Sequence, residues 1–522
     1  MLKDNYYIEP TEIDRLVFEK LIPSDHLLRR VKAAIDFDRF REKVRDSYSP
    51  DMGRGAEDPV RMIKIEFLEF LHNLSDREVL KQLQVNVAFR YFLDLSLDSQ
   101  LPTSGLLSQF RARLGEKRHT ALFDEVVSQA RQKGLVKDRL RLKDATHVIA
   151  NVAIPSTIGL VARTRQRLLR SAGAYAKERA EAEEERAEQI RQMSDDLGDE
   201  DRLLMRIEHL REIVVWADEL HQRLGKPLGG PTPQRKRFAA SLELAHRILD
   251  QCDHPHQPDR TLSTADPDAR TGKHGKYYDG YQLDISMDAD SEIITALATP
   301  PANADEAANA KTLIECEEQA HGNDVQALSI DGIGFRGDVL RSLMNPQGPA
   351  LAVFVPPYEF SSYTTPYYTP ADFHLEKDGT VLVCPNEEET QIRYRNSKNT
   401  GWHFHFKLSQ CRSCPLLAQC METLPVQFGR GVIKNDYEAE YRAAWEVSHT
   451  EAYAQVRQQH PKIERKLAEI IRYHNGRRTR YRGHWRVAIQ YLMTALVVNV
   501  KRIVRLLSLQ PPVGFCQGVA NA

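Results

Sequence analysis

The chain has 522 residues, of which 41% are hydrophobic, so it is long enough to form several packed units. Its formal net charge is −1, and the overall charge therefore predicts neither a nucleic-acid nor a membrane partner. No apolar run follows a basic start, and the most apolar late segment, 487–500, is shorter than the roughly twenty residues of a bilayer span. The seven cysteines are scattered, which excludes a disulfide framework and indicates a reducing, cytoplasmic environment.

Residues 1–138 are predicted to form a helical domain. Asp58-Pro59 places a capping residue before a proline at the first helical position, and Ser75 with Glu78 forms a capping box. Thr103-Ser104 opens a further helix. Short helices with short connections fit a helix-turn-helix-like DNA-binding domain, and they fit equally well a helical bundle with no nucleic-acid role.

A β-strand with a buried acid is predicted at 139–153. Apolar residues surround Asp144 there, and a charge within a core strand is costly unless it is paired or binds a metal ion. The alternative is an ordinary aspartate near a strand end. Residues 160–261 then read as a helical insertion, with a charged run and a later apolar stripe that favour a helical hairpin or a coiled coil.

From Tyr278 the pattern changes to alternating strands and helices, which is typical of an α/β fold. Asp331 ends the strand VQALSID and precedes a glycine-containing loop. Open α/β sheets bind ligands at this end of their strands, whereas the alternative is an aspartate that caps the next helix. The α/β core is predicted to combine 139–159, 262–355 and 451–510.

Residues 356–450 are predicted to form a β-rich insertion, because they are rich in aromatic residues and prolines. Four cysteines in it could supply soft ligands for a structural Zn²⁺ ion: Cys384, Cys411, Cys414 and Cys420. His403 and His405 are alternative ligands. The competing interpretation is a small subdomain with reduced thiols.

The C-terminal region combines an acid with many basic residues: 457–505 contains thirteen Lys or Arg and two Asp or Glu. In the predicted helix HPKIERKLAEIIRY, Ile463, Leu467 and Ile470 form a stripe that can pack on a sheet, with Glu464 at its edge. The basic residues predicted to face DNA phosphates are Arg465, Lys466, Arg472, Arg477, Arg478, Arg480 and Arg482.

These stretches together resemble the DDE transposases of bacterial insertion sequences. The resemblance lies in DPVRMIKIEFLEFLHNLSDREVLKQL near the N-terminus, LKDATHVIAN around the first aspartate, LSIDGIGFRGDVL around the second, and HPKIERKLAEIIRYHNGRRTRYRG around the glutamate. CPLLAQC is similar to a cysteine segment that some members carry. The helical segment 160–226 is the part that resembles the family least.

The resemblance implies a ribonuclease-H-like fold in which Asp144, Asp331 and Glu464 are the catalytic residues. These carboxylates would hold Mg²⁺ or Mn²⁺ ions, which prefer oxygen ligands. The implied reaction is cleavage of double-stranded DNA at the terminal inverted repeats of the element, followed by strand transfer into target DNA. A homodimer on DNA is also implied.

The sequence departs from the family pattern close to these acids. Relatives often place Tyr and Arg seven and four residues before the glutamate, where this chain has Arg457 and His460. Gly-Ile-Gly-Phe follows Asp331, where relatives often have Gly or Ala followed by Tyr. Two alternatives to a transposase are a related metal-dependent nuclease or domesticated copy, and a non-catalytic DNA-binding protein.

Overall fold

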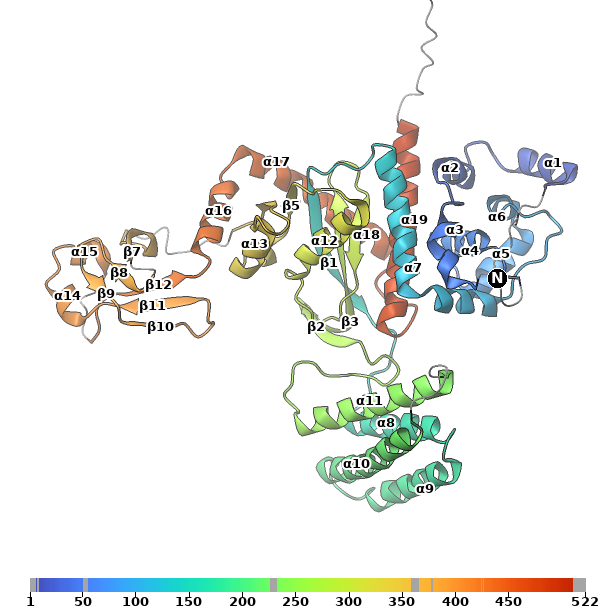
Figure 1. The fold of residues 1–522 in the computed structure, drawn as a ribbon, viewed down its shortest axis with the longest axis horizontal. Coiled ribbons are helices and arrows are strands. Elements are labelled where there is room, and N and C mark those ends of the chain that lie inside the picture. Colours follow the sequence, from blue (N-terminus) through green and yellow to red (C-terminus); the bar gives the residue numbers. More distant parts are fainter. Residues whose placement is uncertain are drawn as a thin grey trace, which may run out of the picture.

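The computed structural model describes residues 6, 9–49, 55–225, 232–357, 366–376, 379–423, 425 and 427–509. The fold is mixed α and β, with one central sheet between several helical groups. The N-terminal helices lie on one side of this sheet, and a small β-rich subdomain lies on the opposite side (Figure 1). No helix in the described part of the chain is long and apolar enough to cross a bilayer.

The N-terminal part is helical, as the sequence predicts. Its elements are α1 (Glu12–Leu21), α2 (Leu27–Ala34), α3 (Phe40–Val44), η1 (Arg45–Ser47), α4 (Pro59–Leu71), α5 (Asp76–Val85), α6 (Val87–Phe92) and α7 (Ser104–Gln132). The Asp58 side chain accepts a hydrogen bond from the Val60 amide at the start of α4. Ser75 and Glu78 form the predicted capping box of α5.

The central sheet has the strand order β2-β3-β1-β5-β6, with β4 paired to β3. The strands are β1 (Arg141–Ile149), β2 (Arg270–His274), β3 (Lys276–Asp288), β4 (Ile294–Ala298), β5 (Ala327–Ser329) and β6 (Ala352–Phe354). β1 is antiparallel to β3 and parallel to β5, and β5 is parallel to β6. The sheet is therefore mixed, and segments from two distant parts of the chain meet at β1.

The helices around the sheet are α12 (Asn309–His321), η2 (Gly332–Gly334), α13 (Gly337–Met344), α16 (Glu438–Ser448), α17 (Glu451–Gln459), α18 (Pro461–Tyr473) and α19 (His484–Leu509). α19 lies between the N-terminal helices and the sheet, beside α7 (Figure 1). Its residues contribute to both cores: Ile489, Met493 and Val497 pack with the N-terminal helices, whereas Tyr491 and Leu492 pack with the sheet. A helix that is apolar on nearly all sides can join two cores in this way.

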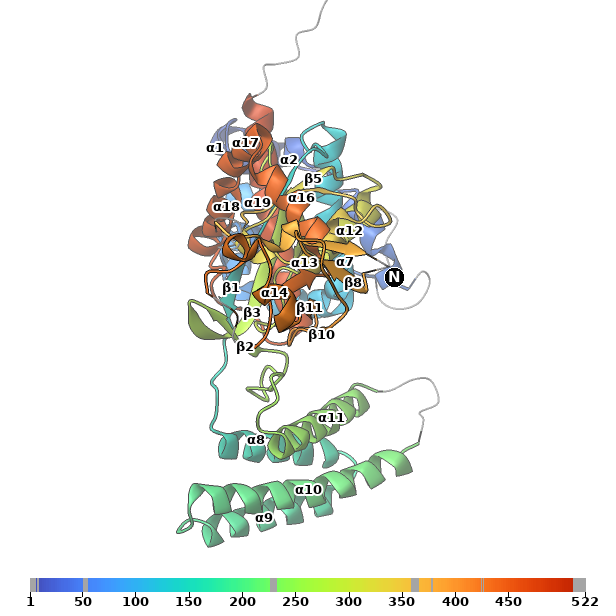
Figure 2. The ribbon, with the colours of Figure 1, turned by 90° about the vertical axis from the view of Figure 1, so that its left-hand side faces the viewer.

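The predicted helical insertion contains α8 (Thr157–Ala172), α9 (Lys177–Met193), α10 (Asp199–Arg223) and α11 (Pro233–Asp253). α8, α10 and α11 form their own apolar core, which includes Leu168, Leu210 and Phe238, and α9 packs against α8 and α10. Figure 2 shows that the helical bundle lies below the sheet and is connected to it by two chain segments.

The β-rich subdomain has two three-stranded sheets, β7-β8-β9 and β10-β11-β12. Its elements are η4 (Pro370–Asp372), β7 (His374–Glu376), β8 (Val381–Val383), β9 (Glu389–Thr390), β10 (Arg393–Arg395), β11 (Gly401–His405), α14 (Leu408–Arg412), α15 (Leu417–Cys420) and β12 (Gly431–Asn435). Phe373, Leu382 and Phe404 are buried in its small core.

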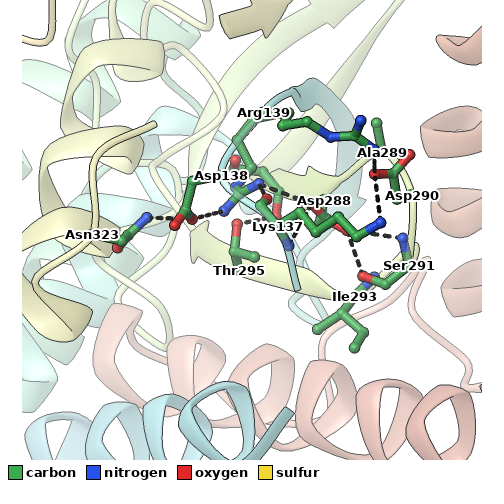
Figure 3. A network of polar contacts seen from close by, with 12 residues as sticks. Lys137, Asp138, Arg139, Asp288, Ala289, Asp290, Ser291, Ile293, Thr295 and Asn323 are labelled. Carbon is green, nitrogen blue, oxygen red and sulfur yellow. Dashed lines mark hydrogen bonds and ion pairs between the residues drawn. The ribbon is translucent and has the colours of Figure 1, made fainter. Parts of the chain in front are cut away.

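A polar network fixes the start of β1. Asp288 accepts hydrogen bonds from the Ser291 amide at 2.8 Å and from the Lys137 amide at 3.3 Å, and Asn323 donates to Asp138 at 3.0 Å (Figure 3). The fully buried Arg141 pairs with Glu317 of α12 at 2.6 Å and with Asp288 at 3.0 Å. A buried charge pair needs such complete partners, so this network holds β1 in one position against β3 and α12.

Candidate active site

Asp144 lies within β1, whereas Asp331 lies two residues beyond the end of the parallel strand β5, at the N-cap of η2 and not at the end of a strand as predicted. β1 and β5 pair at Arg141 with Leu328 and at Leu142 with Ser329. Asp144 lies two residues beyond Leu142, and Asp331 lies two residues beyond Ser329. Both acids therefore follow the last paired position of β1 with β5, and Asp331 is close enough for its charge to raise the pKa of Asp144.

The helix α18 covers the face of β1 that carries Asp144. Side chains alternate along a strand, so Leu142, Asp144 and Val148 share one face. Leu142 and Val148 belong to the same buried cluster as Ile463, Leu467 and Ile470 of α18. The predicted apolar stripe of α18 does pack on the sheet, as expected. Glu464 follows Ile463 in the first turn of this helix and is exposed.

Asp144 is held in an environment that disfavours its negative charge. Burial, together with the negative charges of Glu306 and Asp331, raises the pKa of Asp144 to about 7. Its Oδ1 atom accepts a hydrogen bond of 2.8 Å from the Ala145 amide, which acts in the opposite direction. The negative charges of Asp144 and Asp331 therefore repel one another, and a cation bound between two carboxylates relieves such repulsion.

Glu306 is a further acid of this region that the sequence did not reveal. It lies in the loop between β4 and α12, and burial and the charge of Asp331 both raise its pKa. Its carbonyl oxygen accepts a 2.7 Å hydrogen bond from Lys143, and the adjacent Asp305 accepts one of 2.6 Å from Arg336. The loop is therefore fastened to β1 on one side and to the segment after Asp331 on the other. Its sequence, PPANADEAANA, contains no motif that would single out Glu306.

Lys143 supplies a buried positive charge next to Asp144. It is 1% exposed and pairs with the fully buried Asp284 of β3 at 3.1 Å. Burial raises the pKa of Asp284 to about 7, and the Lys143 charge opposes that shift. Lys143 points to the opposite face of β1 from Asp144, because the two residues are consecutive in a strand.

The carboxylates do not form a finished metal site. Throughout the described residues, no three His, Cys, Asp or Glu side chains are arranged to hold a metal ion. Asp144 and Asp331 fit a Mg²⁺ or Mn²⁺ ion by donor chemistry, since both are hard oxygen ligands that repel one another. Asp331 is close enough for its charge to raise the pKa of Asp144, whereas within the described ranges the Glu464 side chain forms no hydrogen bond or ion pair with either aspartate.

The predicted DNA-binding residues divide into two groups. Arg465, Arg472, Arg478 and Arg482 are exposed. The other three make contacts inside the protein: Lys466 is 4% exposed and pairs with Glu469, Arg477 donates to the His147 carbonyl at 2.6 Å, and Arg480 pairs with Glu69 of α4 at 3.1 Å. The exposed group is therefore the one available to a ligand.

The four cysteines of the β-rich subdomain line one small cavity, but, like the carboxylates, they are not arranged as a metal-ligand group in the described residues. Burial raises the pKa values of Cys411 and Cys420, and the neighbouring thiols raise them further. The Cys411 sulfur also accepts a hydrogen bond of 3.2 Å from the Arg430 amide. His403 and His405 are not part of this cavity, and both contact the Tyr394 hydroxyl.

Two family models match the chain, and both describe transposase domains. A transposase domain (DUF772) matches residues 16–113, and a transposase DDE domain matches residues 383–504. No curated protein and no solved structure matches the chain significantly. The first match runs from within α1 into α7, and the second runs from the end of β8 into α19 and includes Glu464.

The two domain matches support the predicted identification of the chain as a DDE transposase of an insertion sequence, and together they cover less than half of its residues. Asp144 and Asp331 lie outside both matched segments, so their assignment depends on the resemblance and on the geometry given above.

Proposed function

We propose that this transposase cleaves DNA at the terminal inverted repeats of its element and joins the ends to target DNA. Asp144, Asp331 and Glu464 are the catalytic carboxylates of the proposal, within a ribonuclease-H-like core. The single observation that supports it is that Asp331 lies close enough to Asp144 for its charge to raise the pKa of Asp144, on the face of β1 against which the helix that bears Glu464 packs.

Asp144 and Asp331 would hold a divalent cation between β1 and β5, and Glu464 would complete the ligand set from α18. The cation supplies activation of the attacking oxygen and stabilisation of the leaving oxygen during displacement at phosphorus. The protein's contribution is positional: the network at Arg141 fixes β1, and the Ile463 stripe fixes α18 against it.

Double-stranded DNA is the proposed partner of the exposed arginines on α18 and the following turn. Arg465, Arg472, Arg478 and Arg482 lie in the part of the chain that has few acids, which favours contact with phosphates. The N-terminal helices are the proposed DNA-binding domain. A homodimer that pairs two DNA ends is part of the same proposal.

The experiment is cleavage of a labelled duplex that carries the element's end, with Mg²⁺ or Mn²⁺. Asp144→Asn, Asp331→Asn and Glu464→Gln are each expected to reduce the cleavage rate at least about 100-fold, since metal ligands act as a unit. Glu451→Gln changes an exposed acid on α17 and serves as the matched control. Cleavage by Asp144→Asn at the wild-type rate would refute the catalytic assignment.

Joining of pre-cut ends to a plasmid separates a transposase from a nuclease. Wild-type protein should produce joined products, and the three carboxylate variants should not. Cleavage without joining would instead support the related nuclease or the domesticated copy. DNA binding with no cleavage by the wild type would support a non-catalytic DNA-binding protein.

A structural Zn²⁺ ion in the β-rich subdomain completes the proposal. Four cysteines line one cavity, the neighbouring thiols raise the pKa values of Cys411 and Cys420, and a bound Zn²⁺ ion would favour the thiolate forms. Metal analysis of purified protein should find close to one zinc per chain, and a Cys411→Ser/Cys414→Ser variant should lose it. Zinc-free wild-type protein that keeps a folded subdomain would exclude this site.

A further inference from the structure

The junction between α17 and α18 is fastened to the end of β5 by three hydrogen bonds. Arg457 Nη1 donates to the Ile330 carbonyl at 3.0 Å and to Ser329 Oγ at 3.3 Å. Ser329 Oγ and His460 Nδ1 lie 3.1 Å apart. Ser329 is fully buried and His460 is 3% exposed, so these contacts are shielded from water. They connect positions 128 and 131 residues apart in the chain.

The donors and acceptors of this contact can be assigned consistently with the neutral form of His460. Ser329 Oγ accepts from Arg457, so its own proton is free to be donated to His460 Nδ1. Burial and the nearby Arg457 charge lower the pKa of His460 to about 4, which keeps the ring neutral near pH 7. A neutral ring that accepts at Nδ1 carries its proton at Nε2. The Ser329 hydroxyl then both accepts and donates within the contact.

The location of this contact connects two of the proposed catalytic residues. Ser329 is the register partner of Leu142 and lies two residues before Asp331. His460 lies one helical turn before Glu464. The contact therefore joins the strand that leads to Asp331 directly to the helix that carries Glu464.

We propose that Arg457 and His460 are positioning residues that clamp the Glu464 helix to Ser329, and that neither residue contacts DNA. The proposal rests on the function proposed above, and it refines the roles of two positions at which the chain departs from its relatives. The Arg457 guanidinium donates a hydrogen bond to the main-chain carbonyl of the residue before Asp331, so fewer of its N–H groups are left to bind a DNA phosphate. Packing of the apolar stripe that contains Ile463 fixes the distance of α18 from the sheet. The clamp additionally prevents α18 from sliding along the sheet.

Loss of the clamp should weaken the metal site without weakening DNA binding. Metal coordination tolerates only a few tenths of an ångström in ligand position, so a small slide of Glu464 reduces cation affinity. Arg457→Ala and Ser329→Ala are each expected to raise the Mn²⁺ concentration for half-maximal cleavage about tenfold, with the KM for DNA within about twofold of wild type. Arg457→Lys keeps one donor and should recover part of the loss.

The matched control is Arg465→Ala, which removes the same charge from an exposed position on α18. It should raise the KM for DNA and reduce the salt dependence of DNA binding, with an unchanged Mn²⁺ midpoint. A melting curve for each variant identifies any that fail to fold, and Arg457→Lys then replaces Arg457→Ala in the comparison.

Mn²⁺ binding measured by electron paramagnetic resonance, without DNA, gives a readout that does not depend on activity. Weaker Mn²⁺ binding by Arg457→Ala than by Arg465→Ala supports the clamp, whether or not the wild type cleaves DNA. If the wild type fails to cleave, the proposed function is wrong and the clamp still stands. The clamp would be overturned if the wild type cleaves DNA and Arg457→Ala shows a raised KM for DNA with an unchanged Mn²⁺ midpoint. That result would leave the proposed function intact.

Discussion

Arg480 Nη1 donates a 3.1 Å hydrogen bond to Glu69 Oε1, so the turn after the Glu464 helix is joined to the N-terminal helix α4. Arg480 also donates to the Leu74 carbonyl at 3.0 Å, and Arg111 approaches the other Glu69 oxygen at 3.1 Å. Glu69 is 1% exposed, and its burial raises its pKa to about 7. The N-terminal domain and the catalytic core are therefore connected by a buried ion-pair network as well as by α19.

Replacement of Arg480 should mainly affect stability. Arg480→Ala leaves a buried carboxylate with one fewer partner, and we expect it to lower the free energy of unfolding by about 2–4 kcal/mol at pH 8. Arg478→Ala, two residues away and exposed, should change stability by less than about 0.5 kcal/mol and should weaken DNA binding. Urea denaturation and a DNA-binding titration measure the two effects. Equal stability for both variants would contradict the internal role of Arg480.

Asp144→Asn should stabilise the metal-free protein at alkaline pH. The pKa of Asp144 is near 3.8 in the unfolded chain and about 7 in the fold, so its ionisation opposes folding as pH rises from about 4 to 7. The amide removes this cost, and the variant should be more stable than wild type by about 2–4 kcal/mol at pH 8 in EDTA. The difference should vanish near pH 4.

Chemical denaturation across this pH range tests the expectation. Asp196→Asn, which changes an exposed aspartate in the helical insertion, is the control and should show no pH-dependent gain. A constant difference between Asp144→Asn and wild type from pH 4 to pH 8 would show that the carboxylate is not perturbed.

Glu306→Gln should make Asp144 easier to ionise. The negative charge of Glu306 raises the pKa of Asp144, so its removal lowers that pKa. The stability gained on Asp144→Asn substitution at pH 8 should therefore be smaller in the Glu306→Gln background than in the wild-type background. Asp305→Asn is a stringent control, because the charge of Asp305 is already paired with Arg336. The prediction fails if both backgrounds reduce the gain equally.

Lys143→Met should destabilise the protein in a pH-dependent way. Without Lys143, the fully buried Asp284 loses its counter-charge, and its pKa rises further. The ionised form then opposes folding more strongly, so the expected loss is about 3–5 kcal/mol at pH 8 and smaller at pH 5, where Asp284 is protonated. Unfolding measured at both pH values checks the sign. Addition of Asp284→Asn should recover much of the stability at pH 8, and its failure to do so would exclude this ion pair as the cause.

The sequence by itself determined the local elements and the family of this protein. Asp58 and Ser75 act through neighbouring amides, so the starts of α4 and α5 could be predicted from a few residues. Side-chain periodicity placed Asp144 on a strand and Ile463 on the buried side of α18, because alternation and helical repeat are local properties, whereas the strand predicted to end at Asp331 ends at Ser329.

Only the tertiary structure decided which distant residues meet. The register of β1 against β5, the approach of Glu306 to Asp144, and the use of Arg480 by Glu69 each join segments more than 150 residues apart. Such contacts depend on how strands pair and helices pack, and no sequence motif marks a basic residue as bound internally. Arg480 and Arg478 look alike in the sequence, but burial gives the first an acid partner and leaves the second in solvent.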